Sequence, residues 1–185
     1  MHKIPCVIFA GGKSRRMGED KALLDFGGKP LALYQYERLK EIFENVAIAT
    51  KTKKFDFEAP FIFDSDKTFA PTPVILDIFN FYEEFFAISV DAPFIDKSVI
   101  DKIVDTAKKN PHKNAIIAKT KKPQPLIGIY RKSIAPFIEE ALSLGDYKLG
   151  AILHRADTAF VEFDEDRRFL NLNYPQDFQE ALKYL

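Results

Sequence analysis

Short apolar runs alternate along the chain with longer amphipathic stretches. The apolar runs lie at residues 4–10, 46–50, 61–63, 85–90, 115–118, 126–130, 160–163 and 169–172. Runs that are apolar throughout are typical of strands buried on both faces. Apolar residues at helical spacing fill the stretches 31–43, 74–84, 96–109, 134–144, 148–155 and 175–184. This alternation predicts an α/β fold, with a parallel or mostly parallel sheet and helices on both faces.

Capping residues mark several of the expected helix starts. Pro30 and Pro175 stand where a first helical turn tolerates proline, and Asp96 is a candidate N-cap. The chain shows no internal repeat, low-complexity segment or long linker. With 185 residues, of which 46% are hydrophobic, it is long enough for one well-packed domain over residues 1–185.

Composition excludes several kinds of protein. Lysine and arginine (27) balance aspartate and glutamate (27), so the chain lacks the basic surplus that binds nucleic acid or an anionic membrane. The single Cys6 excludes a disulfide framework, and three scattered histidines offer no spacing for a histidine metal site. No apolar run is long enough to span a bilayer or serve as a secretory signal. We therefore expect a soluble cytoplasmic protein in which any metal binds to carboxylates.

The first predicted strand runs directly into a glycine-rich basic segment, AGGKSRRMGEDK at residues 10–21. In an open α/β sheet, ligands bind beyond the carboxyl end of such a strand. Glycines let backbone amides approach a phosphate closely, and nearby cations neutralise its charge. The cations here are Lys13, Arg15, Arg16 and Lys21. A P-loop would require glycine where Val7 stands, and the dinucleotide fingerprint requires different glycine intervals. The segment therefore indicates another kind of polyphosphate loop, with an ordinary solvated turn as the alternative.

Residues 9–31, FAGGKSRRMGEDKALLDFGGKPL, resemble the signature of the molybdenum cofactor guanylyltransferases, the MobA-like nucleotidyltransferase family. Phe9 stands where leucine is usual. The resemblance implies a doubly wound, Rossmann-like nucleotidyltransferase fold that binds GTP. The GTP-binding residues implied in this segment are Phe9, Ala10, Gly11, Gly12 and Lys21. Lys21 would reach the phosphates, and from their charge and position Arg15 and Arg16 are expected to assist it in catalysis.

Two predicted strands end in aspartate. Asp91 follows the run at 85–90, and by resemblance it is the metal-binding and catalytic aspartate; a turn before Pro93 is the alternative. Mg²⁺ suits such a place because it needs only one or two carboxylates beside phosphate oxygens. Asp64 follows the run at 61–63 and falls at the family's nucleotide-contacting aspartate, with Asp66 as its alternative.

Two segments depart from the family pattern. Residues 70–75, APTPVI, stand where the family has a glycine-containing stretch, which puts close backbone approach there in doubt. Thr50 and Lys51 stand near the place of a family asparagine, and no role is assigned to them.

The second half carries the features expected to face the acceptor. Residues 119–125 form a basic, proline-containing stretch expected as a loop, with Gln124 where the family has histidine. Asn171 and Asn173 are two apart and would share one face of a strand; the resemblance associates them with the pterin. The sequence thus predicts a nucleotide-binding part at about residues 1–95 and an acceptor part at about 96–185.

The predicted reaction transfers GMP from GTP to molybdenum-bound molybdopterin, with Mg²⁺ as cofactor and pyrophosphate as the second product. The attacking phosphate is already anionic, so alignment and charge neutralisation are the main tasks. Further partners would be molybdoenzymes or their chaperones. The alternatives are a cytidylyltransferase or sugar-phosphate nucleotidyltransferase of the same fold, and a non-catalytic protein that binds a pterin or nucleotide.

Overall fold

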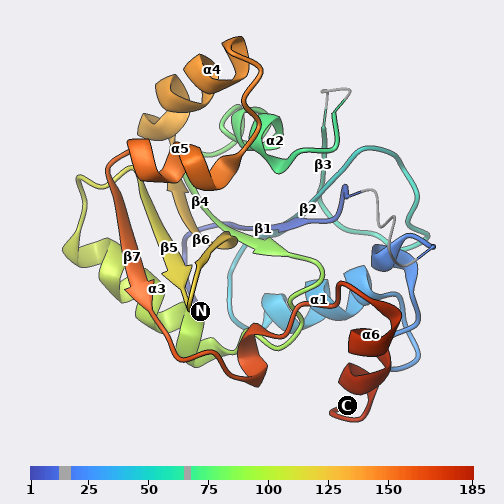
Figure 1. Ribbon diagram of the computed structural model, residues 1–185. Helices are drawn as coiled ribbons and strands as arrows, with labels where there is room; N and C mark the ends of the chain where they lie inside the picture. Colours follow the sequence, from blue (N-terminus) through green and yellow to red (C-terminus); the bar gives the residue numbers. More distant parts are fainter. Residues whose placement is uncertain (13–17, 65–67) are drawn as a thin grey trace.

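A seven-stranded mixed sheet forms the centre of the molecule in the computed structural model, which describes residues 1–12, 18–64 and 68–185 (Figure 1). The strand order is β3-β2-β1-β4-β6-β5-β7. The strands are β1 (Cys6–Phe9), β2 (Val46–Thr50), β3 (Phe61–Phe63), β4 (Glu84–Ser89), β5 (Ala115–Lys119), β6 (Pro123–Arg131) and β7 (Thr158–Glu162). All neighbouring pairs are parallel except those that β6 makes with β4 and β5. The predicted α/β fold with a mostly parallel sheet is confirmed.

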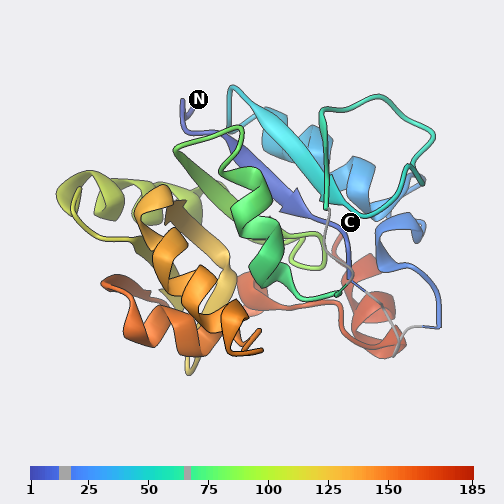
Figure 2. The same cartoon turned by 90° about the horizontal axis from the view of Figure 1, so that it is seen from above.

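Helices cover both faces of this sheet, as predicted (Figures 1 and 2). The helices are α1 (Leu31–Lys40), α2 (Pro71–Ile78), α3 (Lys97–Lys109), α4 (Ala135–Ser143), α5 (Leu149–Arg155) and α6 (Pro175–Leu182). One buried cluster joins the sheet to α1, α3 and α6, and a second joins it to α2, α4 and α5. Each central strand contributes side chains to both clusters. This explains why its buried residues are apolar on both faces. Among the described residues, no helix is both long and apolar enough to cross a membrane.

The predicted helix starts are mostly confirmed. Asp96 caps α3 by accepting the amide of Val99 at 3.0 Å, and α6 begins at Pro175. The helix expected at 74–84 is instead α2, which begins at Pro71 and ends at Ile78. Proline is tolerated in a first helical turn because the amide it lacks has no partner there, so the segment's prolines start the helix.

Two expectations for the second half are wrong. Residues 169–172 form no strand: a 3-10 turn at Arg167–Phe169 is followed by extended chain. Phe169 and Leu172 are buried against the core without strand pairing, and burial alone accounts for their apolar pattern. The loop expected at 119–125 is a tight hairpin, because β5 continues to Lys119 and β6 begins at Pro123.

Gly128 allows β6 to lie between β4 and β5. A Cβ atom built on Gly128 would lie 2.3 Å from the carbonyl oxygen of Ile116 and 2.9 Å from the Cα of Ile117. Both are backbone atoms of the neighbouring strand, so the clash can be relieved only by separating paired strands. The close approach of two backbones therefore requires glycine at this position.

We expect Gly128→Ala to lower the free energy of unfolding by about 3 kcal/mol, the range found for overpacked cores. Urea unfolding measures the change. Gly150→Ala is the matched control: nothing lies within 4 Å of a Cβ there, and alanine is favoured over glycine in the helix α5. A Gly128→Ala protein as stable as its parent would contradict the strand spacing described here.

Candidate functional site

Four parallel strands, β3, β2, β1 and β4, end at one edge of the sheet, and their backbones are joined just beyond it. The amide of Ala10 donates to the carbonyl of Ala49 at 2.9 Å, and that of Asp64 donates to Thr50 at 3.0 Å. The amide of Val90 donates to Phe9 at 3.1 Å. From β1 the chain passes through α1 to β2 on one side, and from β4 it passes through α3 to β5 on the other, so the strand order reverses between β1 and β4. Ligands of open α/β sheets bind at such a point.

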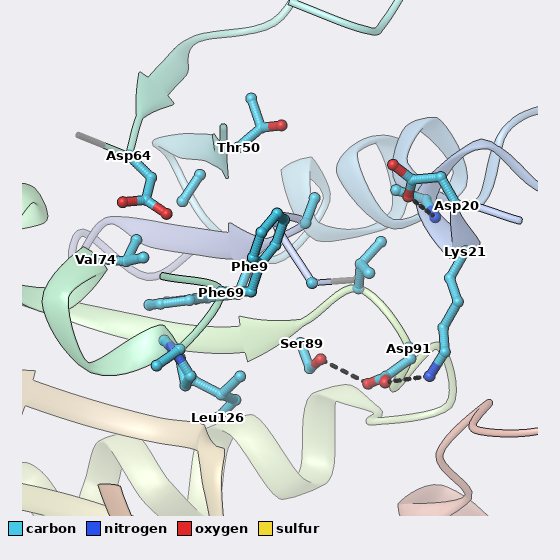
Figure 3. Close-up of a pocket in the computed structure, with 18 residues that line it drawn as sticks. Phe9, Asp20, Lys21, Thr50, Asp64, Phe69, Val74, Ser89, Asp91 and Leu126 are labelled. Atoms are coloured by element: carbon cyan, nitrogen blue, oxygen red, sulfur yellow. Dashed lines mark hydrogen bonds and ion pairs between the residues drawn. The ribbon is translucent and has the colours of Figure 1, made fainter. Parts of the chain in front are cut away.

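A cavity of about 240 Å³ opens at this edge (Figure 3). Its wall contains every residue from 9 to 12, together with Lys21, Asp64 and Asp91, so most of the nucleotide-binding residues implied by the resemblance lie in one place. The described residues that line it are Phe9, Ala10, Gly11, Gly12, Asp20, Lys21, Ala22, Ala49, Thr50, Asp64, Phe69, Ala70, Pro71, Val74, Ser89, Val90, Asp91 and Leu126.

Lys21 and Asp91 meet at one end of the cavity (Figure 3). The Lys21 Nζ lies 3.1 Å from the Asp91 Oδ2, and both side chains are largely buried, with 14% and 21% exposed. The other carboxylate oxygen of Asp91 accepts the hydroxyl of Ser89 at 2.6 Å. Asp20 accepts the amide of Ala22 at 3.1 Å and so begins the 3-10 turn that presents Lys21. The cation of Lys21 and the carboxylate of Asp91, which are far apart in the sequence, therefore lie in contact in a largely buried place.

The carboxyl-terminal segment contacts both residues at this end of the cavity. The amide of Leu172 donates to the carbonyl of Asp91 at 2.9 Å, and the side-chain oxygen of Asn173 accepts Lys21 Nζ at 3.1 Å. Asn171 contributes its backbone carbonyl, which accepts the amide of Asn173 at 2.9 Å. The strand expected to carry Asn171 and Asn173 is therefore absent, and their assignment to the pterin stays a prediction. Neither is among the described residues that line the cavity.

Asp64 lies at the opposite end of the cavity, beside the ring of Phe69 (Figure 3). Its carboxylate pairs with the ammonium of Lys51 at 2.5 Å, and only 3% of the Asp64 side chain is exposed. The same ammonium lies 5.0 Å from the centre of the Phe69 ring. This end of the cavity thus combines the ion-paired carboxylate of Asp64, a hydrogen-bond acceptor, with the aromatic ring of Phe69. The apolar side chains of Val74 and Leu126 also line the cavity.

Buried polar groups on α1 support the segment that carries Asp91. Gln35 is fully buried and donates to the carbonyls of Ser89 and Val90 at 3.3 and 3.4 Å. Arg38 donates to the carbonyl of Ile95 at 2.6 Å and to the Gln35 side chain at 2.6 Å. Burial lowers the pKa of Arg38 from its ordinary value, and nearby Asp96 opposes that shift. Because buried polar groups are costly without partners, these contacts fix the chain on both sides of Asp91.

Several predicted positions lie outside the described residues: Lys13, Arg15 and Arg16 of the basic segment, and Asp66. Gln124 is described, and it donates to the Thr120 hydroxyl at 3.1 Å within the β5–β6 hairpin.

The segment at 70–75 forms the start of α2. Its Thr72 hydroxyl donates to the carbonyl of Tyr147 at 2.8 Å, while Pro71 and Val74 face the cavity. Apolar side chains therefore stand where the family has glycine.

Sequence reasoning missed Phe69, Ser89 and Lys54. Ser89 stands two residues before Asp91 on a strand end, a spacing that could have suggested it. Phe69 is one of 18 phenylalanines, and Lys54 is one of several lysines in the run KTKK at 51–54, so neither is distinguished by its surroundings in the sequence.

The donor set at Asp91 suits a cation that takes few ligands from protein. Among the residues that the structure describes, no group of three histidine, cysteine or acidic side chains could hold a metal by itself. Mg²⁺ typically retains water and takes one or two carboxylates with phosphate oxygens. Asp91, already paired with the positive charge of Lys21, fits such an ion when a polyphosphate supplies the remaining oxygens.

Known proteins resemble this chain over nearly its whole length. Residues 6–159 match the model of the MobA-like NTP transferase domain. A molybdenum cofactor guanylyltransferase of Campylobacter jejuni is 34% identical, with 97% of this chain and 96% of that protein aligned. One of Helicobacter pylori is 30% identical, with 98% and 93% aligned.

A solved structure has the same fold. The crystal structure of molybdopterin-guanine dinucleotide biosynthesis protein A from Archaeoglobus fulgidus superposes with a TM-score of 0.85. The alignment covers 98% of both chains at 23% identity.

Proposed function

The chain belongs to the MobA-like NTP transferase family, and we propose that it transfers GMP from GTP to molybdenum-bound molybdopterin with release of pyrophosphate. The observation that carries this proposal is the contact between Lys21 and Asp91 at one end of the cavity, 3.1 Å apart. A largely buried ammonium can neutralise phosphate charge, and a carboxylate just beyond a strand can hold the metal of a metal-bound triphosphate. The guanylyltransferase names of the relatives in Campylobacter and Helicobacter agree with this chemistry.

The two ends of the cavity suggest how GTP lies in it. The phosphates would occupy the end formed by Lys21 and Asp91. The backbone amides of Gly11 and Gly12, which also line the cavity, would face the phosphates. The base would lie toward Asp64, against the Phe69 ring. Aromatic rings stack on nucleobases without regard to identity, so Phe69 would supply affinity and leave selection to polar groups.

Asp64 is the group we expect to select guanine. An ionised carboxylate only accepts hydrogen bonds, and guanine presents two adjacent N–H donors, N1–H and the N2 amino group. The Lys51 ammonium, 2.5 Å from the Asp64 carboxylate, balances its charge. The other bases lack this pair of donors, so Asp64 would leave them less well bound.

The chemical step is an in-line displacement at the α-phosphorus. An oxygen of the pterin's terminal phosphate forms a bond to that phosphorus as the bond to the bridging oxygen of the β-phosphate breaks, and pyrophosphate carries away the electron pair. No proton has to be removed from the attacking oxygen, because it is already anionic. Lys21 would move from Asp91 to the phosphates and neutralise the charge that builds on them.

Mg²⁺ is the cofactor we propose, with Asp91 as its protein ligand. It would neutralise triphosphate charge and bring the α-phosphate and leaving group into line. Ser89, which donates to Asp91 at 2.6 Å, would keep the carboxylate turned toward the cavity.

The acceptor is proposed to bind on the side formed by the second half of the chain. We assign residues 1–95 mainly to GTP and residues 96–185 mainly to the pterin, within one domain. Asn173 would link the two, because its side chain already accepts a hydrogen bond from Lys21. Molybdoenzymes or their chaperones would then receive the product.

Gly12 provides a test of backbone contact with the ligand. Nothing lies within 4 Å of a Cβ built on Gly12, and its backbone is not in the left-handed region. We therefore expect Gly12→Ala to leave the unfolding free energy within about 0.5 kcal/mol of the parent. Because the added methyl group would hold a phosphate away from the amide, GTP affinity should fall by about tenfold or more. Calorimetric titration with GTP and Mg²⁺, beside urea unfolding, gives both quantities; unchanged affinity would place the ligand elsewhere.

A binding panel tests the proposed function and its alternatives. Thermal shift with GTP, CTP, ATP and UTP, each with Mg²⁺, measures which ligand binds the folded form, because such a ligand raises its melting temperature. We expect GTP to give the largest shift, and Asp64→Asn to remove the preference for it. A larger shift with CTP or UTP would indicate a cytidylyltransferase or sugar-phosphate nucleotidyltransferase. GTP binding without pyrophosphate release in the presence of the pterin would indicate a non-catalytic protein.

A further inference from the structure

Lys54 connects the two ends of the glycine-rich segment. Its ammonium donates to the carbonyl of Ala10 at 2.8 Å and to the carboxylate of Asp20 at 2.5 Å. Ala10 is the residue that leaves β1, and Asp20 is the residue that begins the turn bearing Lys21. One side chain from the connection between β2 and β3 therefore joins positions that are ten residues apart in the sequence.

Both partners of Lys54 line the cavity, whereas Lys54 is not among the described residues that do. Its side chain is 16% exposed, and that of Asp20 is 32% exposed. The ammonium thus contacts two residues of the cavity wall without itself being among the described lining residues. Hydrogen bonds from a charged donor in a place with little water are stronger than those between neutral groups.

Ala10 and Asp20 each make a second hydrogen bond, which connects them to neighbouring parts of the site. The amide of Ala10 is bound to β2 through the carbonyl of Ala49 at 2.9 Å, which directs the chain into Gly11. The second carboxylate oxygen of Asp20 accepts the amide of Ala22 at 3.1 Å, which sets the turn from which Lys21 projects. Lys54 therefore fixes Ala10, where the segment leaves the sheet. It also fixes Asp20, where the turn that carries Lys21 begins.

We propose that Lys54 is a positioning residue for GTP: it holds Ala10 and Asp20 at a fixed separation, so that the backbone at Gly11 and the ammonium of Lys21 meet the triphosphate together. This inference rests on the proposed function. Reactions that depend on alignment are sensitive to such supports, since a small displacement of a binding group costs up to a hundredfold in rate. Lys54 exerts its effect without touching the nucleotide.

Three variants test the proposal. Lys54→Met removes the charge and its hydrogen bonds, and Lys54→Arg keeps a charged donor. Lys53→Met is the matched control, because it removes an equal charge from an exposed neighbour. The measurements are GTP affinity by calorimetry with Mg²⁺, kcat and KM for pyrophosphate release, and amide hydrogen exchange of residues 6–12 and 18–22 in the free protein.

We expect Lys54→Met to lower kcat/KM for GTP by about tenfold or more and to speed amide exchange at Ala10 and Ala22, whose amides are hydrogen-bonded in the parent. Lys54→Arg should recover most of the loss, and Lys53→Met should match the parent. Parental kinetics and parental exchange in Lys54→Met would overturn the proposal. Should Lys54→Met not fold, Lys54→Gln, a shorter neutral donor, takes its place with the same expected losses.

The exchange measurement separates this proposal from the proposed function. If the parent protein neither binds GTP nor releases pyrophosphate, the proposed function fails and the role of Lys54 in binding GTP fails with it. If the parent does both while Lys54→Met keeps its affinity and its exchange rates, only the role of Lys54 is overturned. Faster exchange together with weaker GTP binding in Lys54→Met, in a functional parent background, supports both.

Discussion

Asp91→Ala is expected to lower kcat for GMP transfer by about a thousandfold or more while the protein remains folded. The carboxylate is the proposed ligand of Mg²⁺, and it also balances the charge of Lys21 at 3.1 Å. Losing an electrostatic contact aimed at the transferring phosphate typically costs a hundred- to a thousandfold, and losing the proposed protein ligand of Mg²⁺ adds to that. Initial rates of pyrophosphate release at saturating Mg²⁺ and pterin measure the change.

Asp56→Ala is the matched control for this prediction, because Asp56 is an exposed aspartate in the connection between β2 and β3. It should keep the parental rate. Urea unfolding of Asp91→Ala should show a loss of no more than about 2 kcal/mol, the cost of leaving one partner of a partly buried hydrogen bond unpaired. Parental turnover in Asp91→Ala would remove this residue from the mechanism.

Lys21→Ala is expected to weaken GTP binding and to lower kcat/KM by about a hundredfold. Its ammonium is proposed to pass from Asp91 to the phosphates, where in a site poor in water it contributes a few kcal/mol to the transition state. Because part of that contribution is made only as charge builds on the leaving pyrophosphate, kcat should fall as well as affinity. Single-turnover rates at saturating GTP separate the two effects.

Lys53→Ala provides the comparison for Lys21→Ala, since it removes an exposed lysine of the same charge. It should bind and turn over GTP as the parent does. Equal kinetics for Lys21→Ala and the parent would mean that the cavity binds something other than a triphosphate at this end.

The strands at the centre of the sheet could be predicted from the sequence because their buried residues are apolar on both faces. β1, β2 and β4 are buried on both faces, so each appears in the sequence as a short run of apolar residues. The antiparallel placement of β6 could not be predicted in the same way. An apolar run identifies a strand without giving its direction, and the turn at Thr120–Lys122 contains no glycine to mark a hairpin.

The segment at 169–172 shows the limit of apolar patterns more clearly. Phe169 and Leu172 are buried like strand residues, yet the backbone amide of Leu172 donates to the carbonyl of Asp91 instead of joining a ladder. Tertiary packing of the carboxyl-terminal segment against the site determines this contact. A local pattern contains no information about such a distant partner.

The candidate site was predictable where a residue belongs to a compact motif. Lys21 and Asp91 were selected by their places after strands and by resemblance, and the structure brings their side chains into contact. Phe69 and Lys54 could not be selected in this way, because neither belongs to such a motif. Phenylalanine and lysine occur in many other roles in a chain of this composition. Their contacts arise only in the folded chain, where Lys54 reaches Ala10 and Asp20 and the Phe69 ring lies beside the ammonium of Lys51.

Transfer of label from GTP tests the central claim most directly. The purified protein is incubated with GTP labelled in its α-phosphate, Mg²⁺ and molybdenum-bound molybdopterin, and the pterin product is separated from free nucleotide. We predict that the label enters the pterin, with one pyrophosphate released for each, and that labelled CTP gives little product. A pterin that stays unlabelled, while the same preparation binds GTP, would contradict the proposed transfer of GMP.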